Sequence, residues 1–385
     1  MYDPPPPMDF QLNDEQRAIR RLARDFADGE VRPAAARHDR EESFPYEIVT
    51  RLGELGLMGV PFPHEYGGGG ADYISYALVV EEMARVDSSV AITLAAHNSL
   101  GVYPIHTFGT DEQRASWLPD LCSGRRLAAF GLTEPDAGSD AASLRTTAEQ
   151  DGDDWVINGS KQFITNAGTD ISACVTIAAR TGESEISAFI VPNGTPGYTV
   201  EPPYRKMGWK ASDTRPLAFD DCRVPADAIL GPRGRGYAQF LETLAGGRIS
   251  VSAMGVGLAQ GALDEALAYA KQRNAFGQPI SKFQAIQMKL ADLATEIEAA
   301  RLLTLRAAAL KQRGHPKFDI VAAAAKLKTG RLAVRATEEA VQIHGGYGYI
   351  EDYPVCRFYR DAKVLTIGEG TDEVQQMVIA RHLGC

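Results

Sequence analysis

A glutamate near the end of the chain has a glycine on each side. In LTIGEGTDEVQQ, Glu369 lies between Gly368 and Gly370. Glycine is disfavoured inside regular structure but tolerated in tight or closely approached backbone, so the two glycines predict a turn that orients the carboxylate. An oriented carboxylate can act as a general base. Taken alone, the triplet is more typical of a solvent-exposed loop, so this assignment depends on the rest of the chain.

Two earlier segments could bind a ligand that is rich in hydrogen-bond acceptors. AFGLTEPDAGSD carries Thr133 and Ser139 around a Glu-Pro turn, and KQFITNAG carries Phe163 and Thr165. Hydroxyl groups can match the polar edge of a ligand once water is excluded, and an aromatic ring can stack on a planar group. Each segment alone is also compatible with an ordinary turn.

Two later segments could bind a phosphate or allow a cofactor to approach the backbone. KQRNAFGQPI places Arg273 and Phe276 at the end of an expected helix. Arginine suits bidentate binding of a pyrophosphate, although a surface arginine is the simpler interpretation of any single case. In QIHGGYGYIEDYPVCRFYRDAK, Gly345 and Gly346 would let backbone approach a partner or cofactor closely.

The elements that must position these segments change character along the chain. In the N-terminal third, Asn13 can cap a helix together with Gln16, and apolar residues at helical spacing follow. From about residue 125 short strand-like runs appear, including CVTIAA, SAFIVP and TRPLAFDDCRV. The pair Asn158-Gly159 predicts a hairpin turn between two further runs.

Long helical tracts dominate the last third of the chain. They extend over residues 237–273, 284–313 and 318–344. Helices of this length exceed the usual three turns and predict a helical bundle. The predicted domains are an N-terminal helical domain (1–125), a central β domain (126–235) and a C-terminal helical bundle (236–385).

Composition excludes several classes of function. The 385-residue chain is 44% hydrophobic and 23% charged, which is typical of a globular protein with two or three domains. A net charge of -10 argues against a nucleic-acid partner. No apolar run reaches the roughly 18 residues of a membrane-spanning helix. The acidic, proline-rich N-terminus lacks the features of a signal or transit peptide, so we expect a cytoplasmic protein without membrane insertion.

Common catalytic and cofactor motifs are missing from the sequence. GVGLAQG has a misplaced glycine for a dinucleotide fingerprint and lies in a helical tract, and no P-loop or G-x-S-x-G elbow occurs. The seven histidines show no paired spacing for a metal, and the five cysteines are scattered without a C-x-x-C. Rossmann, hydrolase and metalloenzyme functions are therefore disfavoured, and no metal site is predicted.

In their order and spacing, the five segments resemble the acyl-CoA dehydrogenase family, within it the short-chain and short-branched-chain members. The resemblance covers nearly the whole chain after the proline-rich start, including GWKASDTRPLAFDDCRVP and GRISVSAMGVGLAQGALDEAL. It implies an α+β fold with an N-terminal helical domain, a central β domain and a C-terminal four-helix bundle. It also implies an acyl-CoA substrate, FAD completed by a neighbouring subunit of a homotetramer, and electron-transfer flavoprotein as the electron acceptor.

The resemblance assigns roles to residues around the cofactor. Thr133 is expected near the flavin ring, Ser139 near the pyrophosphate or the CoA chain, and Thr165 near flavin N5. Phe163 takes a position where many relatives carry tryptophan. The residues implied in FAD binding are Phe130, Leu132, Thr133, Gly138, Ser139, Phe163, Ile164, Thr165, Arg273, Phe276, Gln284, Gln342, Ile343, Gly345, Gly346, Thr371 and Glu373.

Glu369 matches the catalytic base of the family, which removes the proton α to the thioester carbonyl while a hydride leaves the β carbon. A free glutamate has a pKa near 4.3, so an apolar pocket must raise it. Relatives of the isovaleryl and long-chain type carry the base on a helix, directly before the arginine that matches Arg248. There this chain has Gly247, which agrees with Glu369 as base. Ser139, Arg248 and Gly370 are implied as substrate-binding residues.

The length and branching of the acyl group stay open at this point, and two functions other than a dehydrogenase remain as alternatives. HNSLGVYPI resembles the short-chain enzymes and favours a C4-like acyl group, while isobutyryl- and 2-methylbutyryl-CoA are alternatives. A flavin oxidase of the same fold is disfavoured because acyl-CoA oxidases are commonly much longer. A non-catalytic acyl-CoA-binding or scaffold protein is disfavoured because the base and the flavin contacts are intact.

Overall fold

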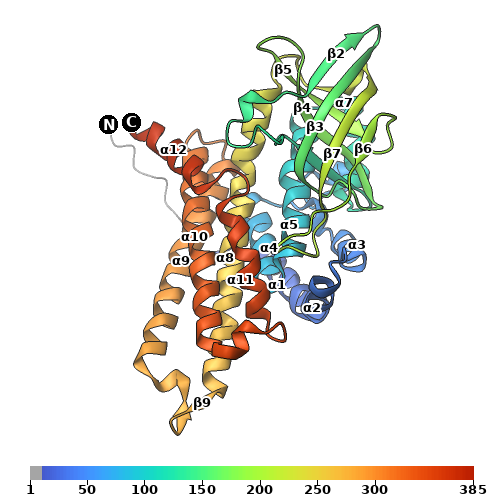
Figure 1. Ribbon diagram of the computed structural model, residues 1–385. Coiled ribbons are helices and arrows are strands. Elements are labelled where there is room, and N and C mark those ends of the chain that lie inside the picture. Colours follow the sequence, from blue (N-terminus) through green and yellow to red (C-terminus); the bar gives the residue numbers. More distant parts are fainter. Residues whose placement is uncertain (1–10) are drawn as a thin grey trace.

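The chain folds into three regions. The computed structural model describes residues 11–385, so most of the proline-rich start, on which the targeting prediction depends, lies outside the described residues. Figure 1 shows a group of shorter helices from the first third, a twisted sheet at one end, and long helices that extend away from it. The predicted α+β class, with the order helical, β, helical, is confirmed.

The first region is helical from the start of the described chain. Asn13 caps α1 (Asp14–Phe26) by accepting from the Gln16 N–H, and the Gln16 side chain accepts from the Asn13 N–H. The predicted capping box is therefore confirmed. The elements that follow are η1 (Ala27–Val31), α2 (Arg32–Glu41), α3 (Tyr46–Glu54), η2 (Leu57–Gly59), η3 (His64–Tyr66), α4 (Tyr73–Val86), α5 (Ser88–Ala96), η4 (His97–Val102), α6 (Tyr103–Phe108) and α7 (Asp111–Cys122).

The central region is a mixed sheet of eight strands. The elements are β1 (Leu127–Gly131), η5 (Ala141–Ser143), β2 (Thr147–Asp151), β3 (Asp154–Thr165), β4 (Ser172–Arg180), β5 (Ile186–Pro192), β6 (Tyr198–Val200), β7 (Thr214–Pro225), η6 (Ala226–Ala228) and β8 (Ile229–Leu230). Neighbouring strands follow the order β6-β7-β3-β2-β4-β5-β8, and β1 pairs with β4 in parallel. The three predicted strand-like runs are confirmed as β4, β5 and β7.

The hairpin predicted at Asn158-Gly159 is wrong. Both residues lie inside the continuous strand β3, at a bulge where its pairing with β7 shifts register. The Asn158 side chain accepts from the Asp221 N–H at 2.8 Å, and Gly159 has φ 145° with Thr146 where a β-carbon would lie. The hairpin turn is at Gly152, between β2 and β3. A bulge and a hairpin turn both favour glycine, so the dipeptide alone does not separate them.

Three long helices form most of the last region, within one residue of the predicted tracts. The elements are α8 (Gly236–Gln272), β9 (Asn274–Ala275), β10 (Gln278–Pro279), η7 (Ile280–Lys282), α9 (Gln284–Gln312), α10 (Phe318–His344), η8 (Gly345–Tyr349), α11 (Pro354–Ala362), η9 (Lys363–Thr366) and α12 (Asp372–Leu383). Helix α8 packs against both α4 and α10. A β-carbon at Gly257 or Gly261 would lie 2.2 or 2.1 Å from a backbone oxygen of α4, so glycine permits this close packing.

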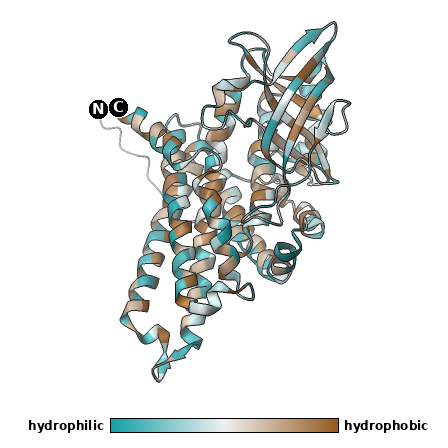
Figure 2. Cartoon of the chain, viewed as in Figure 1, coloured by the Kyte–Doolittle hydropathy of each residue, from teal (hydrophilic) through white to brown (hydrophobic). Residues whose placement is uncertain are grey.

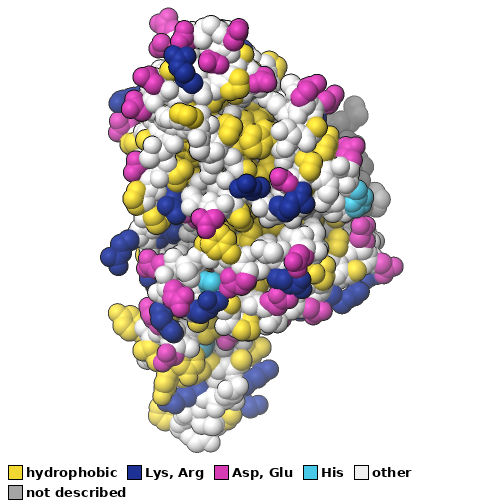
Figure 3. Space-filling model, turned by 90° about the vertical axis from the view of Figure 1, so that its right-hand side faces the viewer, with side chains coloured by type: hydrophobic (Ala, Val, Ile, Leu, Met, Phe, Trp, Pro, Cys, Tyr) yellow, Lys and Arg dark blue, Asp and Glu magenta, His cyan; other side chains and the backbone are white. Residues whose placement is uncertain are grey.

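The surface and the helix faces carry both polar and hydrophobic side chains. Figure 2 shows bands of hydrophobic and hydrophilic residues along the long helices, as expected where neighbours cover one side. Figure 3 shows acidic and basic side chains interspersed over one face, with hydrophobic side chains gathered in a hollow in its upper half. Among residues 11–385, no helix is long and apolar enough to cross a membrane. The same residues contain no cluster of three potential metal ligands.

Candidate active site

The turn around Glu369 lies between η9 and α12 and has a left-handed backbone. Glu369 has φ 53° and Gly370 has φ 89°. A positive φ is uncommon for a residue with a side chain and persists where its surroundings hold it. Gln375 Nε2 donates to the carbonyl oxygens of Glu369 (3.1 Å) and Gly370 (3.0 Å), and Lys326 Nζ donates to that of Gly370 (2.6 Å). The tight turn predicted from the flanking glycines is present.

The carboxylate of Glu369 lies against α8. A β-carbon on Gly247 would be 2.1 Å from Oε2 of Glu369, so glycine leaves the space that the carboxylate fills. Oε2 is buried without a hydrogen-bond partner in the described part of the chain, although the residue as a whole is partly exposed. Burial raises the pKa of Glu369 from 4.5 to about 7, against the opposing charges of Lys326 and Arg248. Near neutral pH this carboxylate is a far stronger base than an ordinary glutamate.

Two cations lie near the carboxylate without forming an ion pair. Arg248 follows Gly247 on α8 and is buried, and burial lowers its pKa. Its Nε has no hydrogen-bond partner among the described residues. Lys326 is fully buried on α10, and burial lowers its pKa to about 8. With one carboxylate and two cations, the site favours a bound anion.

The segments that carry Thr133 and Thr165 meet beside the sheet. Gln162 N donates to the Thr133 carbonyl oxygen at 2.8 Å, which joins the loop after β1 to the end of β3. The hydroxyls of Thr133, Ser139 and Thr165 make no hydrogen bond to any residue of 11–385. Ser139 is exposed and the two threonines are partly exposed. The hydroxyls predicted to meet a ligand are therefore free to do so.

A buried ion pair fixes these two segments. Lys161 Nζ donates to Oε1 of Glu134 at 2.7 Å, and both side chains are buried. The Glu134 carboxylate also accepts from the N–H groups of Arg145 and Thr146. Neither Glu134 nor Lys161 was predicted as a site residue. The signal for Glu134 was its place in the Glu-Pro turn, whereas nothing in the sequence marks Lys161 as buried.

The other predicted residues of this region divide into exposed and buried side chains. Phe163 has φ 62° and is 65% exposed, so its ring is available for stacking. Phe130 instead stacks on Phe240 of α8 with a centroid distance of 4.2 Å. Leu132 and Ile164 are buried in hydrophobic clusters, so a ligand would meet them through their backbone.

At two predicted ligand-contacting positions, no described part of the chain requires the residue to be glycine. A β-carbon at Gly138 or Gly346 would meet no described atom within 4 Å, and neither residue has a positive φ. Packing and backbone strain would therefore accept other residues there. Glycine is needed at such positions when a ligand approaches the backbone, so both fit a bound FAD.

A second group of predicted cofactor residues lies at the far end of the bundle. It comprises Arg273, Phe276, Gln284, Gln342, Ile343, Gly345 and Gly346. Figure 1 shows β9, between α8 and α9, at the end opposite the sheet. A pocket of about 530 Å³ there is lined by Arg273, Ile343 and both glycines, and Phe276 is 95% exposed. Within one folded chain, this group is therefore far from Thr133 and Thr165.

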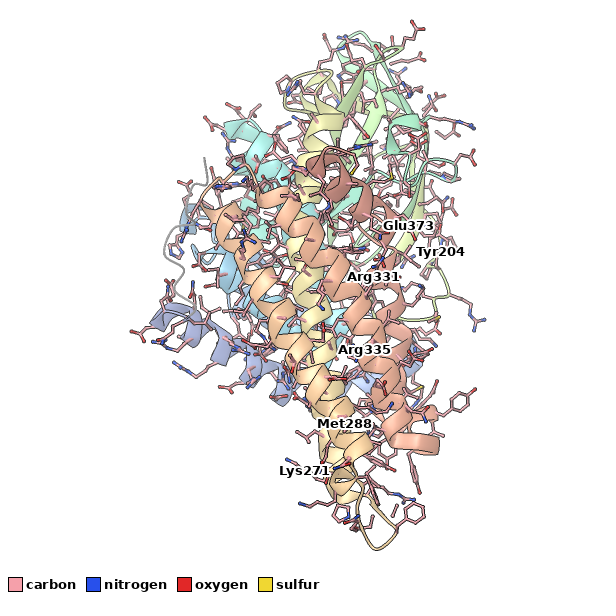
Figure 4. All side chains as sticks on the ribbon, turned by 90° about the vertical axis from the view of Figure 1, so that its left-hand side faces the viewer. Tyr204, Lys271, Met288, Arg331, Arg335 and Glu373 are labelled. Atoms are coloured by element: carbon pink, nitrogen blue, oxygen red, sulfur yellow. The ribbon has the colours of Figure 1, made fainter. Side chains whose placement is uncertain are left out.

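Thr371 and Glu373 lie directly after the turn. Thr371 caps α12 by accepting from the Val374 N–H at 3.3 Å, and Glu373 is exposed in the first turn of the helix. Both line a pocket of about 420 Å³ together with Arg331 and Lys363. Figure 4 shows Arg331 on α10 and Glu373 on α12 on the same side of the molecule. Thr371 and Glu373 therefore share a surface with the turn, and neither is a hydrogen-bond partner of Oε2 of Glu369.

The sequence did not predict the residues that hold the turn. Lys326 and Gln375 are both fully buried and contact its carbonyl oxygens. A signal for Lys326 did exist, since it lies four residues after buried Ala322 and three before buried Thr329 on one side of α10. A lysine at a core position of a helix requires a partner for its ammonium group.

Comparisons with known proteins agree with this fold. Acyl-CoA dehydrogenase domains match the chain in three parts: the N-terminal domain over residues 13–125, the middle domain over 129–222 and the C-terminal domain over 234–384. Probable acyl-CoA dehydrogenase YngJ of Bacillus subtilis is 52% identical over 98% of this chain and 100% of its own. A short-chain specific acyl-CoA dehydrogenase of Clostridium acetobutylicum is 45% identical over 97% and 99%.

Solved structures give the same result. Butyryl-CoA dehydrogenase from Megasphaera elsdenii has a TM-score of 0.95 and 46% identity, covering 98% of this chain and 100% of its own. A chain from work on the electron transferring flavoprotein of Acidaminococcus fermentans has a TM-score of 0.95 and 44% identity, covering 98% and 99%. The chain belongs to the acyl-CoA dehydrogenase family and is an FAD-dependent oxidoreductase, as the resemblance predicted.

Proposed function

We propose that this protein converts a short-chain or short-branched acyl-CoA to the 2-enoyl-CoA, with Glu369 as catalytic base. The observation that carries the proposal is the Glu369 carboxylate, buried against Gly247 with Oε2 unpartnered and a pKa raised to about 7. The short acyl group is supported by relatives that are named short-chain specific and butyryl-CoA dehydrogenase.

In this proposal the chain orients the α carbon of the thioester and receives its proton. The proton passes to a carboxylate oxygen of Glu369, which is free because no described side chain bonds to Oε2. The Glu369 N–H likewise donates to no described acceptor and can bind the thioester oxygen as negative charge develops there. When bound, FAD supplies the hydride acceptor, at N5, for the β carbon. Arg248 and Lys326 favour the anionic enolate by charge.

The residues present fit FAD, and we assign its binding to two subunits. Thr133, Ser139, Phe163 and Thr165 offer free hydroxyls and an exposed ring on one chain. The group around Arg273 lies at the end of the folded subunit that is opposite the sheet, so a neighbouring subunit of a homotetramer would supply these residues to the FAD site. The same proposal includes domain limits near residues 125 and 235. It also includes a cytoplasmic location, and electron-transfer flavoprotein as the electron acceptor.

A small cavity beside Gly246 supports a short acyl group. Its volume is about 10 Å³, room for about one water, and its lining includes Tyr76, Ser99, Tyr103 and Lys311. Gly246 directly precedes Gly247, whose missing side chain leaves the space for the base. Tyr76, Tyr103 and Lys311 therefore leave little free space beside Gly246.

The test is anaerobic bleaching of the flavin absorbance by a panel of thioesters: butyryl-, isobutyryl-, 2-methylbutyryl-, isovaleryl-, octanoyl- and glutaryl-CoA. We expect rapid bleaching by butyryl-CoA or a short branched thioester. Bleaching by octanoyl- or glutaryl-CoA alone would refute the short-chain assignment. Fast reoxidation by air without electron-transfer flavoprotein would favour an oxidase. A colourless protein that cannot be reconstituted with FAD would favour a binding protein.

A further inference from the structure

Lys326 is a buried lysine without a carboxylate partner. It lies inside α10 with none of its surface exposed. In the described part of the chain no Asp or Glu oxygen lies within ion-pair distance of Nζ, unlike Lys161, whose Nζ is 2.7 Å from Glu134. A buried ammonium without an anion is costly, so a compensating role is expected.

Among the described residues, the one hydrogen bond of the Lys326 ammonium goes to the turn. Nζ donates to the Gly370 carbonyl oxygen at 2.6 Å. Gln375 Nε2 already donates to the same oxygen at 3.0 Å and to the Glu369 carbonyl oxygen at 3.1 Å. The turn therefore has a neutral donor that can hold it, and what Lys326 adds is a positive charge next to the base.

The charges that face this point come from three helices and from Glu369 in the turn. Helix α8 contributes Arg248, α10 contributes Lys326 itself, and α12 contributes Asp372 and Glu373. Asp319 of α10 interacts with Arg248, and Tyr76 of α4 lies near Glu369 with a pKa that burial raises, so that it stays neutral. The carboxylates of Asp372 and Glu369 oppose the charge of Lys326 most strongly, and Asp372 also binds Arg331 at 2.8 Å.

We propose that Lys326 is a positioning residue of the dehydrogenation: its ammonium holds the Gly370 carbonyl and favours the ionised base and the anionic enolate. This inference rests on the proposed function. The hydrogen bond fixes the backbone on which Glu369 is mounted. The charge acts through space, because an opposite charge close to a carboxylate stabilises its ionised form.

The charge effect has a defined sign and size. Lys326 lowers the pKa of Glu369, which burial sets at about 7, so Lys326→Met should raise that pKa further. A rise of about one unit would lower the ionised fraction at pH 7 about fivefold. The acidic limb of the kcat/KM profile should move to higher pH by the same amount, while activity recovers toward wild type well above it.

The experiment compares anaerobic flavin reduction by butyryl-CoA across pH for the wild type, Lys326→Met, Lys326→Gln and Lys326→Arg. We expect the shifted limb in the Met and Gln variants and its restoration in the Arg variant. Lys328→Met is the matched control, because Lys328 lies two residues further on α10, is partly exposed and pairs with Glu296. Its profile should match the wild type.

Outcomes separate this inference from the proposed function. If the wild type is bleached by no thioester, the proposed function fails first. If the wild type is bleached and Lys326→Gln keeps its pH profile, Lys326 has no electrostatic role. Equal loss in the Met, Gln and Arg variants without a shifted limb would show a structural role only. FAD content and thermal unfolding of each variant identify misfolded protein, and the milder Gln variant keeps the test valid should Met not fold.

Discussion

Gly247→Ala tests the contact between the base and α8. The new β-carbon would lie 2.1 Å from Oε2 of Glu369. Non-bonded carbon and oxygen atoms need roughly 3.3 Å, so the carboxylate must retreat by about 1 Å. A displacement of that size at a reacting group can cost about 10²-fold in rate. Because the clashing atom is the end of a flexible side chain, the fold should tolerate the change.

We therefore expect Gly247→Ala to bind FAD, to unfold at nearly the wild-type temperature and to be reduced by butyryl-CoA about 10²-fold more slowly. Gly246→Ala is the comparison, since its β-carbon would meet the Lys311 ammonium at 2.4 Å and not the base. Its effect should be milder. The assay is stopped-flow flavin bleaching at saturating substrate.

A second substitution makes the reasoning sharper. Glu369→Asp shortens the side chain and so withdraws the carboxylate from α8. In the double variant Gly247→Ala/Glu369→Asp, the methyl group of the new alanine therefore no longer clashes with the carboxylate. Its rate should then lie close to that of Glu369→Asp alone, a coupling that independent sites would not show. A wild-type rate in Gly247→Ala, or purely multiplicative effects in the double variant, would refute the contact between Gly247 and the reacting carboxylate.

Three further predictions concern the base and the sheet. Glu369→Gln should keep FAD and acyl-CoA binding but lose flavin reduction. Because the pKa of Glu369 is raised to about 7 in the folded state, ionisation destabilises the wild type at high pH, so the free energy of unfolding of the variant, measured with denaturant, should exceed that of the wild type by about 1–3 kcal/mol at pH 8 and equal it at pH 4. Lys161→Met leaves the Glu134 carboxylate buried without its cation, and should lower the free energy of unfolding by about 3–5 kcal/mol by the same method; a loss below about 1 kcal/mol would contradict the buried pair. Gly159 has φ 145°, and Gly159→Ala would place a β-carbon 2.5 Å from Thr146 Oγ1, so the midpoint of thermal unfolding of this variant should fall by several degrees.

The parts of the fold that the sequence predicts well are those set by local pattern. The three long helices were predicted within one residue, because uninterrupted apolar periodicity with caps and breaks determines where a helix begins and ends. The Asn158-Gly159 hairpin failed because a bulge uses the same residues as a turn, and only the pairing with β7 separates them.

The site was predictable where residue type limits function and not where burial decides it. Glu369 between two glycines predicts an oriented carboxylate only together with the other four segments, since the triplet alone is also typical of an exposed loop. Leu132 and Ile164 belong to a predicted ligand segment, yet their side chains are in the core, which depends on strand orientation in the folded sheet. Lys326 was missed because a lysine is normally on the surface, and its burial depends on partners 44 residues away in the chain.

The turn separates two demands that a general base makes on the chain. The carboxylate must be held in place, yet any donor to its oxygens would stabilise the anion and return its pKa toward that of free glutamate. Here the hydrogen bonds from Gln375 and Lys326 go to carbonyl oxygens of the turn, whereas Oε2 receives none from the described residues. Position is thus fixed through the backbone, and basicity through burial against Gly247. A base on an extended flexible side chain in open solvent would meet neither demand, whereas here the left-handed turn holds the backbone and Oε2 of the carboxylate is buried.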